Sequence, residues 1–599
     1  MSDQFQNLAT NNYVAKLYPN SSKTCRLGIC LSGGGSRALT CALGQLSALN
    51  GMIDPKSGKT LLEQALYLSS VSGGSWASIP YTFLPQKING KSVSDAEFLI
   101  QPVAPKDLFK GDSTNSAPGN VSYMGEFCLG TVPQQFNLSN LEKFLETLYT
   151  WGFFTDSPKW SWFWIAGVGE IVLKPFDLYT ASYDSNKDYI EPGKFFSLSK
   201  DHVDASITHI NPSLTSPEFY LCRPNRPALI VNTNILQDYT IPDSAQIPVQ
   251  ASPIATSVPG QSPDGTTIVG GGGVESFAFT STLTGAGTGG TAAVTITRRY
   301  SLCDIAGCSS AFFAAFILQY LNQEIDTIIH DLKWPGWIAA IVKTVLTTIL
   351  DFYTSDLIPK YNYWQLREVG QSNPANLPYG FSDGGDFDNS GILGMLAQTD
   401  ANAIVAFVNT DVPLSENSGS IVVDPSIPLL FGYQETLLKN GQYSGQYVPF
   451  KSMSPSEPMS YVKVFSDAKG EFAALRQGLY DASCGGSAAP GKATAWHLQK
   501  LTTVNNPVAN IKAGREVRVL WVHNNRVDNW QNAIPDTGPN GIRADLRNGQ
   551  QAQPTGPLAY FPSYPIVELY LDPEAVNMLA QLCAWNVQQL QTEILDLLG

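Results

Sequence analysis

The sequence predicts an α/β fold in which a central mixed sheet is covered by helices on both sides. Near the N-terminus, a short apolar strand twice ends at glycines and is followed by a helix-compatible segment. The first of these strands spans 26–32 and the second spans 65–71. Further apolar runs alternate with helical patterns along the rest of the chain, and this alternation is typical of α/β proteins.

Later segments repeat these two patterns. Apolar runs of strand length predict buried strands at 227–234, 404–409 and 517–522. Apolar residues at helical spacing predict a long helix over 302–330 and an amphipathic helical tail over 572–598. These elements extend the alternation of strands and helices to the end of the chain.

The middle of the chain is less regular. Aromatic clusters, prolines and polar loops dominate 101–300, and the Gly-, Thr- and Ser-rich stretch 259–297 predicts a hairpin or a flexible excursion. The length of 599 residues alone would suggest several domains. We nevertheless predict a single domain over 1–599, with cap or lid and loop insertions at about 101–300.

Charge and cysteine content exclude several classes of function. The formal charge of -14, without any cluster of Lys or Arg, argues against nucleic-acid binding and against bulk attraction to anionic membranes. Nine scattered cysteines without a CxxC pair predict reduced intracellular thiols and no zinc site. We therefore expect no metal and no cofactor.

Membrane-directing features are also lacking in the sequence. The polar segment 1–12 has no basic and apolar leader, which predicts no signal peptide and a cytoplasmic protein. No apolar run reaches the roughly 18 residues of a membrane span, since the best candidates, 160–173 and 337–350, contain Glu170 and Lys343. Any contact with a membrane is expected to be peripheral.

The second glycine turn carries a candidate nucleophile. A tight turn from strand to helix exposes a serine hydroxyl and places it at a helix N-terminus, which stabilises negative charge. The run Ser70-Val71-Ser72-Gly73-Gly74 fits such a turn, with Ser70 where the usual motif has glycine. Ser72 is therefore the candidate nucleophile, and a turn of small residues that serves only packing is the alternative.

The first glycine turn offers backbone amides for an anion. Gly33, Gly34 and Gly35 precede a predicted helix, and their N–H groups suit a developing oxyanion or a phosphate. The same residues satisfy G-x-G-x-x-A with Asp54 further along, so a dinucleotide site is an alternative. However, Asp54 precedes Pro55 in a turn-like stretch instead of ending a strand.

A third motif supplies a candidate base. Asp383 is followed by two glycines in the run FSDGGDFDNSGIL, which permits close approach to a neighbouring segment. A calcium loop is the alternative, but Asp386 and Asp388 do not complete the EF-hand spacing. None of the five histidines lies in a motif typical of a catalytic triad, which favours a carboxylate base.

Together these motifs resemble the catalytic domain of the cytosolic phospholipase A2 and patatin-like families. LSGGGSRA resembles their oxyanion element, SVSGGSW their nucleophile elbow, and SDGGDFDNSG their acid element, in the same order. IAGCSSAFF and the C-terminal run from FPSYPIVELY onward add weaker likeness, so that the resemblance spans about 20–590. It implies a three-layer fold with a central mixed sheet and a cap or lid.

The resemblance also implies roles for individual residues. Ser72 would be the nucleophile, and Asp383 would accept its proton directly, without an imidazole. The oxyanion N–H groups would come from Gly34, Gly35 and Gly73. Arg37 falls where these phospholipases place an arginine that steadies the substrate phosphate, and an ion pair beside the helix start is its alternative role.

The predicted function is hydrolysis of fatty-acyl esters of phospholipids or lysophospholipids through an acyl-serine, at a membrane or micelle surface. A neutral-lipid esterase or acyltransferase would share the dyad without needing Arg37. A nucleotide-binding oxidoreductase would use the first glycine turn alone, and a lipid-binding pseudoenzyme would hold its motifs apart in space. For the lipid interface we single out Trp160, Trp162, Trp164 and the segment 337–350, with core packing as the alternative.

Overall fold

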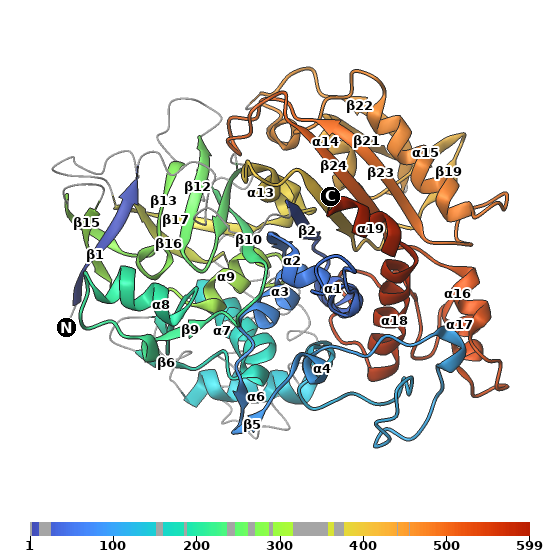
Figure 1. Ribbon diagram of the computed structural model, residues 1–599, viewed down its shortest axis with the longest axis horizontal. Coiled ribbons are helices and arrows are strands. Elements are labelled where there is room, and N and C mark those ends of the chain that lie inside the picture. Colours follow the sequence, from blue (N-terminus) through green and yellow to red (C-terminus); the bar gives the residue numbers. More distant parts are fainter. Residues whose placement is uncertain are drawn as a thin grey trace.

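The computed structural model describes most of the chain. Its described residues are 3–10, 26–150, 160–184, 189–236, 246–261, 270–286, 291–296, 298–314, 358–364, 376–439, 441–454 and 456–598. Within them, one large mixed sheet of 14 strands has helices packed on both of its faces (Figure 1). The predicted α/β fold is confirmed.

A row of parallel strands forms the middle of the sheet. In spatial order these are β10 (Ala228–Leu236), β3 (Tyr67–Val71), β2 (Leu27–Leu31), β18 (Ala403–Val408) and β24 (Glu516–His523). β2 leads into helix α1 (Gly35–Gly51), and β3 leads into α3 (Gly73–Phe83). The carboxyl ends of these strands therefore lie at one edge, where α/β sheets bind their ligands.

Antiparallel strands extend the sheet on both sides. β23 (Ala495–Thr502) pairs with β24 at one end. Beyond β10 follow, in spatial order, β11 (Gln246–Ala251), β12 (Ala255–Gln261), β13 (Gly270–Glu275), β1 (Asp3–Thr10), β15 (Thr291–Ile296) and β14 (Thr282–Ala286). The segment 259–297 was predicted to form a hairpin or a flexible excursion. Its described residues include paired strands of the main sheet.

One edge of β10 is divided between two partners. Its residues 228–232 pair with parallel β3, and its residues 233–235 pair with antiparallel β17 (Asn376–Asp383). Val71, the last residue of β3, lies opposite Asn232, and Asp383, the last residue of β17, lies opposite Thr233. The ends of β3 and β17 therefore meet at neighbouring positions of β10. The outer edge of β17 pairs with β16 (Lys360–Trp364).

The parallel strands are buried on both faces, as in other helix-covered sheets. Along β2, Leu27, Ile29 and Leu31 belong to one hydrophobic cluster and Cys30 belongs to the other. The first cluster is covered by α1, α3 and α18 (Pro573–Gln589). The second is covered by α13 (Ile392–Ala397), α14 (Ser426–Phe431) and α15 (Glu471–Cys484). Figure 1 shows α1 and α18, from opposite ends of the chain, side by side.

Shorter elements complete the described fold. The remaining helices are α2 (Leu61–Gln64), α4 (Asp95–Phe98), α5 (Val132–Gln135), α6 (Leu138–Thr150), α7 (Phe163–Val168), α8 (Lys200–His202), α9 (Leu302–Ser309), α12 (Gly385–Asp388), α16 (Asp528–Ala533), α17 (Ile542–Gly549) and α19 (Gln591–Leu597). The remaining strands pair in twos: β4 (Lys87–Ile88) with β5 (Lys91–Ser92), β6 (Ala181–Asp184) with β7 (Tyr189–Pro192), β8 (Phe195–Ser197) with β9 (Phe219–Leu221), β19 (Ser415–Asn417) with β20 (Ser420–Val422), and β21 (Tyr433–Leu437) with β22 (Tyr443–Pro449).

Several predicted elements are found, and others need correction. The predicted strands correspond to β2, β3, β10, β18 and β24. The helix predicted over 302–330 is not continuous, because α9 ends at Ser309 in a turn. The part at 315–330 lies outside the described residues. The tail predicted over 572–598 is two helices, α18 and α19, which meet at Leu590. The segment 101–300 includes β10, a central strand, and its role as a cap stays a prediction.

Two further calls concern membranes. In the part of the chain that the structure describes, no helix has both the length and the apolar character that crossing a bilayer requires. The segment 337–350, singled out as an interfacial or core helix, lies outside the described residues.

The contact between α1 and α18 can be tested through Gly44. A Cβ atom on this residue would collide with the backbone carbonyl of Ala580 in α18. We expect Gly44→Ala to lower the free energy of unfolding by about 1 to 3 kcal/mol, because the two helices must move apart. Gly51, at the end of the same helix, has no atom within 4 Å of such a Cβ, so Gly51→Ala is the matched control. Equal melting temperatures for the two variants would contradict this tight packing.

Candidate active site

Ser72 occupies a strained turn between β3 and α3. Its φ of 50° and ψ of -120° are unusual for a residue with a side chain, and such a conformation costs on the order of 1 to 3 kcal/mol. The following glycines are needed because there is no room for a Cβ: at Gly74 it would lie 2.5 Å from the Leu31 carbonyl oxygen, and at Gly73 it would collide with the Gly35 carbonyl. The predicted tight turn from strand to helix is therefore present in the backbone geometry.

Asp383 lies beside this turn. The Ser72 hydroxyl donates to Asp383 Oδ2 at 3.2 Å, and the Gly385 N–H donates to Asp383 Oδ1 at 2.8 Å. The next residue, Gly384, must be a glycine because a Cβ there would collide with the carbonyl of Asn232 on β10. The structure thus brings together the predicted nucleophile and the predicted base, from motifs that are far apart in the sequence.

Burial tunes the Asp383 carboxyl. Both Ser72 and Asp383 are only 3% exposed. Desolvation raises the pKa of Asp383 well above its usual range, and the negative charge of Asp386 adds to this effect. Hydrogen bonds from the Gly385 amide and the Ser72 hydroxyl act in the opposite direction. A carboxylate with a raised pKa is a stronger proton acceptor, which suits a general base.

The two helix N-termini meet next to Ser72. Gly34 and Gly35 have φ values of 132° and 58°, which favour glycine, and a Cβ on Gly33 would lie 2.9 Å from the Ser72 Cβ. Among the described residues, no acceptor is found for the amides of Gly34, Gly35 and Gly73, whereas the Gly33 amide donates to the Asn389 carbonyl. These amides, together with two helix dipoles, can stabilise an anion beside the serine.

Arg37 is buried away from solvent. Its Nε donates to the Asn409 carbonyl at 2.9 Å, and its Nη1 donates to the Tyr564 carbonyl and lies 3.2 Å from a carboxylate oxygen of Asp411. Desolvation lowers the pKa of Arg37, an effect that the Asp411 charge opposes. The ion pair beside the helix start, predicted as one of two roles, is therefore present, and a contact with a substrate phosphate stays a prediction.

The alternative sites of the sequence find little support in the described residues. Asp54, the candidate ribose ligand, accepts from the amides of Lys56 and Ser57 within its own turn. Asp388, from the candidate calcium loop, accepts from the amide of Leu393 at the start of α13. In the described ranges, no group of three or more His, Cys, Asp or Glu side chains could hold a metal ion.

Among the described residues, no histidine takes part in this site. The described ones are His202, His209, His497 and His523, and none has a hydrogen bond to Ser72 or Asp383. His523 is fully buried against the Asn524 carbonyl, and burial lowers its pKa to about 4. The remaining histidine, His330, lies outside the described residues.

The tryptophans singled out for a lipid interface pack inside the protein where the structure describes them. Trp164 is 1% exposed and its ring lies 6.2 Å from that of Trp76 in α3. Trp162 is half-buried, and the Arg298 Cζ atom lies over its ring, 4.3 Å from the ring centroid. The core alternative therefore holds for these two residues.

Sequence reasoning missed two residues that shape the site. Ser309 accepts the Ser72 amide at 2.9 Å, and the run IAGCSSAFF that contains it suggested likeness but no role. Asn232 donates from its side-chain amide to Ser69 Oγ and to the Ser70 carbonyl, both at 2.9 Å. The polar run Asn232-Thr233-Asn234 at the end of the predicted strand 227–234 was the available signal for Asn232.

Comparison with known proteins returns phospholipases. No family model matches the chain. It is 33% identical over 73 residues to a lysophospholipase of Torulaspora delbrueckii, which is 12% of this chain and 11% of that protein. It is 47% identical over 60 residues to "Probable lysophospholipase 4" of Schizosaccharomyces pombe, 10% of this chain and 9% of that protein.

Among solved structures, human GIVD cytosolic phospholipase A2 aligns with 97% of this chain and 60% of its own, at a TM-score of 0.43 and 14% identity. The chain is similar to phospholipases. The resemblance predicted from the motifs is thus confirmed. The chain nevertheless matches only about a tenth of the length of the curated relatives. Its activity must therefore be argued from its own residues.

The raised pKa of Asp383 predicts a stability that depends on pH. Because the folded pKa lies above the unfolded value of about 3.9, the proton on Asp383 stabilises the fold below that value, and this stabilisation is lost as pH rises through the folded pKa. Relative to Asp383→Asn, which cannot ionise, the wild type should therefore lose stability across this window.

Thermal unfolding of both proteins at a series of pH values measures this difference. Ser72→Ala keeps the carboxylate but removes its hydrogen bond from Ser72, which raises the pKa of Asp383 further, so its loss of stability should extend to higher pH than in the wild type. A stability difference between wild type and Asp383→Asn that stays constant with pH would contradict the raised pKa.

Proposed function

We propose that this protein is a lipid acyl hydrolase of the phospholipase or lysophospholipase type, which uses Ser72 and Asp383 as a catalytic dyad. The observation that carries the proposal is the 3.2 Å contact between the Ser72 hydroxyl and the carboxylate of Asp383, next to amides without an acceptor. A strained elbow, a base of raised pKa and an anion site at one place form the set that acyl transfer through a serine requires.

The chemistry would proceed in two steps. Ser72 Oγ attacks the ester carbonyl carbon while Asp383 takes the hydroxyl proton, and the resulting oxyanion is held by the amides of Gly34, Gly35 and Gly73. Asp383 then returns the proton to the departing alcohol, which leaves an acyl-serine. In the second step Asp383 accepts a proton from water while the water attacks the acyl carbon, and Asp383 then returns this proton to Ser72 Oγ as the fatty acid departs.

The substrate class is proposed from the matched proteins and the motifs. The names of the fungal relatives and of the human enzyme contain lysophospholipase and phospholipase A2, which favours phospholipids or lysophospholipids at a membrane or micelle surface in the cytoplasm. A neutral-lipid esterase or acyltransferase would use the same dyad. The closeness of Ser72 and Asp383 favours an enzyme over a pseudoenzyme, and the local role of Asp54 disfavours a nucleotide-dependent oxidoreductase.

The dyad predicts equal losses for its two members. We expect Ser72→Ala and Asp383→Asn each to lower kcat by about a thousandfold or more while leaving the fold intact, because residues that act as a unit lose about the same when either is removed. Hydrolysis of a nitrophenyl ester and of a lysophospholipid measures this loss. A fluorophosphonate probe should label the wild type at Ser72.

Asp386→Asn is the matched control, since Asp386 is exposed and lies in α12, which begins two residues after Asp383. It should retain turnover and shift the acid limb of the pH profile to lower pH, because removing its charge lowers the pKa of Asp383. Near-normal turnover by Asp383→Asn, or labelling of a serine other than Ser72, would show that the dyad is wrong.

The role of Arg37 is tested by comparing two substrates. If it binds the substrate phosphate, Arg37→Ala should reduce hydrolysis of a phospholipid at least tenfold more than hydrolysis of a nitrophenyl ester, which lacks a phosphate. Asp411→Asn is the control, because it removes the ion pair and keeps the guanidinium. Equal losses on both substrates, together with a lower melting temperature in both variants, would assign Arg37 to structure alone.

A further inference from the structure

The backbone of the nucleophile is held by a serine from another motif. The Ser72 N–H donates to Ser309 Oγ at 2.9 Å, and the Ser309 hydroxyl donates to the Asn232 carbonyl at 2.7 Å. Ser309 is the last residue of α9 and is 0% exposed. Because its single proton goes to Asn232, Ser309 can meet Ser72 only as an acceptor.

Three more serine hydroxyls continue this contact. Ser75 Oγ lies 3.0 Å from Ser309 Oγ, Ser70 Oγ lies 3.1 Å from Ser75 Oγ, and Ser78 Oγ lies 2.7 Å from Ser70 Oγ. Since Ser309 has no proton left to give, Ser75 must donate to it, Ser70 to Ser75, and Ser78 to Ser70. The direction of the whole chain of hydroxyls is therefore fixed, and hydrogen bonds in such a chain polarise one another. We call these four residues the serine chain.

The serine chain accounts for a departure in the elbow motif. Ser70 stands where the usual motif has glycine, and its side chain is buried between Ser75 and Ser78. A glycine at this position would leave the Ser75 hydroxyl without its donor. Ser70 is thus linked to Ser309 through Ser75.

The turn after α9 also reaches the other parts of the site. The Phe312 amide donates to the Asp383 carboxylate, which helps to keep it ionised. The ring of Phe313 lies against Gly35, where a Cβ would come within 2.9 Å of it. The segment 309–313 therefore contacts Ser72, Asp383 and the N-terminus of α1.

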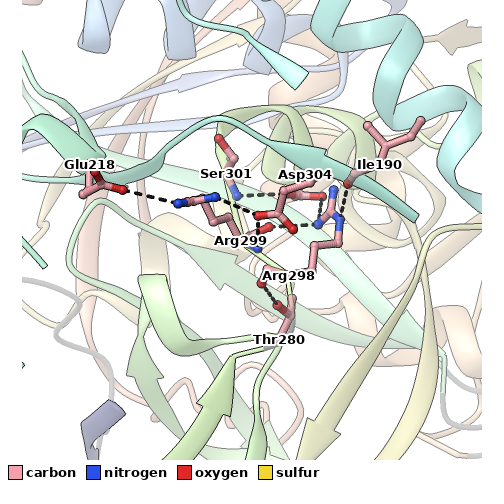
Figure 2. A network of polar contacts seen from close by, with 8 residues as sticks. Ile190, Glu218, Thr280, Arg298, Arg299, Ser301 and Asp304 are labelled. Atoms are coloured by element: carbon pink, nitrogen blue, oxygen red, sulfur yellow. Dashed lines mark hydrogen bonds and ion pairs between the residues drawn. The ribbon is translucent and has the colours of Figure 1, made fainter. Parts of the chain in front are cut away.

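The other end of α9 is fixed by a buried ion pair. Asp304 accepts from Arg298 Nη1 at 2.8 Å and from the Ser301 amide at 2.7 Å, as Figure 2 shows. The hydroxyl of Tyr361 donates to Asp304 at 2.7 Å, and Arg298 Nε donates to the Ile190 carbonyl. Asp304 and Arg298 are 0% and 5% exposed, so this anchor can move only at a large energetic cost.

We propose that Ser309 is a positioning residue, which holds the strained backbone of Ser72 through the serine chain and transmits the rigidity of the α9 anchor to the nucleophile. Without this acceptor, the Ser72 amide would be buried unpaired, and the turn would relax toward an ordinary conformation. The hydroxyl of Ser72 would then leave Asp383, and the amide of Gly73 would turn away from the oxyanion. This inference rests on the proposed function only for its kinetic consequences.

Ser309→Ala tests the proposal, and the chain offers a matched control. Buried Ser276 lies outside the site, where it donates to the Ser252 carbonyl at 2.7 Å and lies 3.0 Å from the hydroxyl of Thr256. The control Ser276→Ala therefore removes the same kinds of contact. We expect Ser309→Ala to lower kcat on a nitrophenyl ester by about 10- to 100-fold, with KM changed less than about threefold. Fluorophosphonate labelling of Ser72 should slow by the same factor.

Two readouts separate positioning from mere stability. Loss of the Ser72 hydrogen bond raises the pKa of Asp383, so the acid limb of the kcat profile should move to higher pH in Ser309→Ala and stay in place in Ser276→Ala. Hydrogen exchange followed by mass spectrometry should show faster exchange of the peptide around Ser72 only in Ser309→Ala.

The outcomes distinguish this inference from the proposed function. If the wild type neither hydrolyses esters nor reacts with the probe, the proposed function fails, and exchange around Ser72 still decides whether Ser309 holds the turn. If Ser309→Ala matches Ser276→Ala in exchange, and in kcat where turnover is present, the positioning role is overturned. Ser70→Ala combined with Ser309→Ala should lose little more than Ser309→Ala alone, whereas multiplied losses would contradict a single serine chain.

Discussion

The site depends on how one edge of β10 is shared. β11 occupies the opposite edge along 231–236, so β3 and β17 must follow each other along the same edge, with β3 on 228–232 and β17 on 233–235. For β17 to enter, β3 must end at Val71, and the chain must leave the sheet at Ser72. The register of a sheet is fixed by its buried faces, and this register places Ser72 and Asp383 at neighbouring positions beside β10.

Asn232 and Asn234 stabilise this exchange of partners. Asn232, the last residue of β10 paired with β3, donates to Ser69 and Ser70 and accepts from Ser309 through its carbonyl. Asn234 donates to the Asp383 carbonyl at 2.6 Å. These amides replace ladder hydrogen bonds that the sheet loses where one strand ends and another begins. Each net hydrogen bond contributes about 0.5 to 1.5 kcal/mol, so several of them offset the strain of about 1 to 3 kcal/mol at Ser72.

The sequence predicted the local elements of this site much better than the contacts between them. β2, β3 and their glycine turns have clear periodicity, and Gly73 and Gly384 were recognisable because close approach leaves no room for a Cβ. The end of α9 was not predicted, because its apolar pattern continues past the point where Ser310 bonds back to the Ala306 carbonyl and the helix stops. The pairing of β1 with β13 and β15, and the ion pair of Arg37 with Asp411, join residues far apart in the chain, and no local pattern encodes them.

A dyad without histidine needs a dry site. A solvated carboxylate has too low a pKa to accept a proton from a serine hydroxyl efficiently, and here desolvation is the largest cause that raises the pKa of Asp383. Water that entered with a polar substrate would solvate the carboxylate and lower the pKa of Asp383 again. Under the proposed function, a fatty-acyl chain would keep the surroundings of the carboxylate apolar while its ester carbonyl would reach the amides of Gly34 and Gly35. Under the proposed function, the burial of Ser72 and Asp383 therefore serves both the strength of the base and the preference for lipid esters.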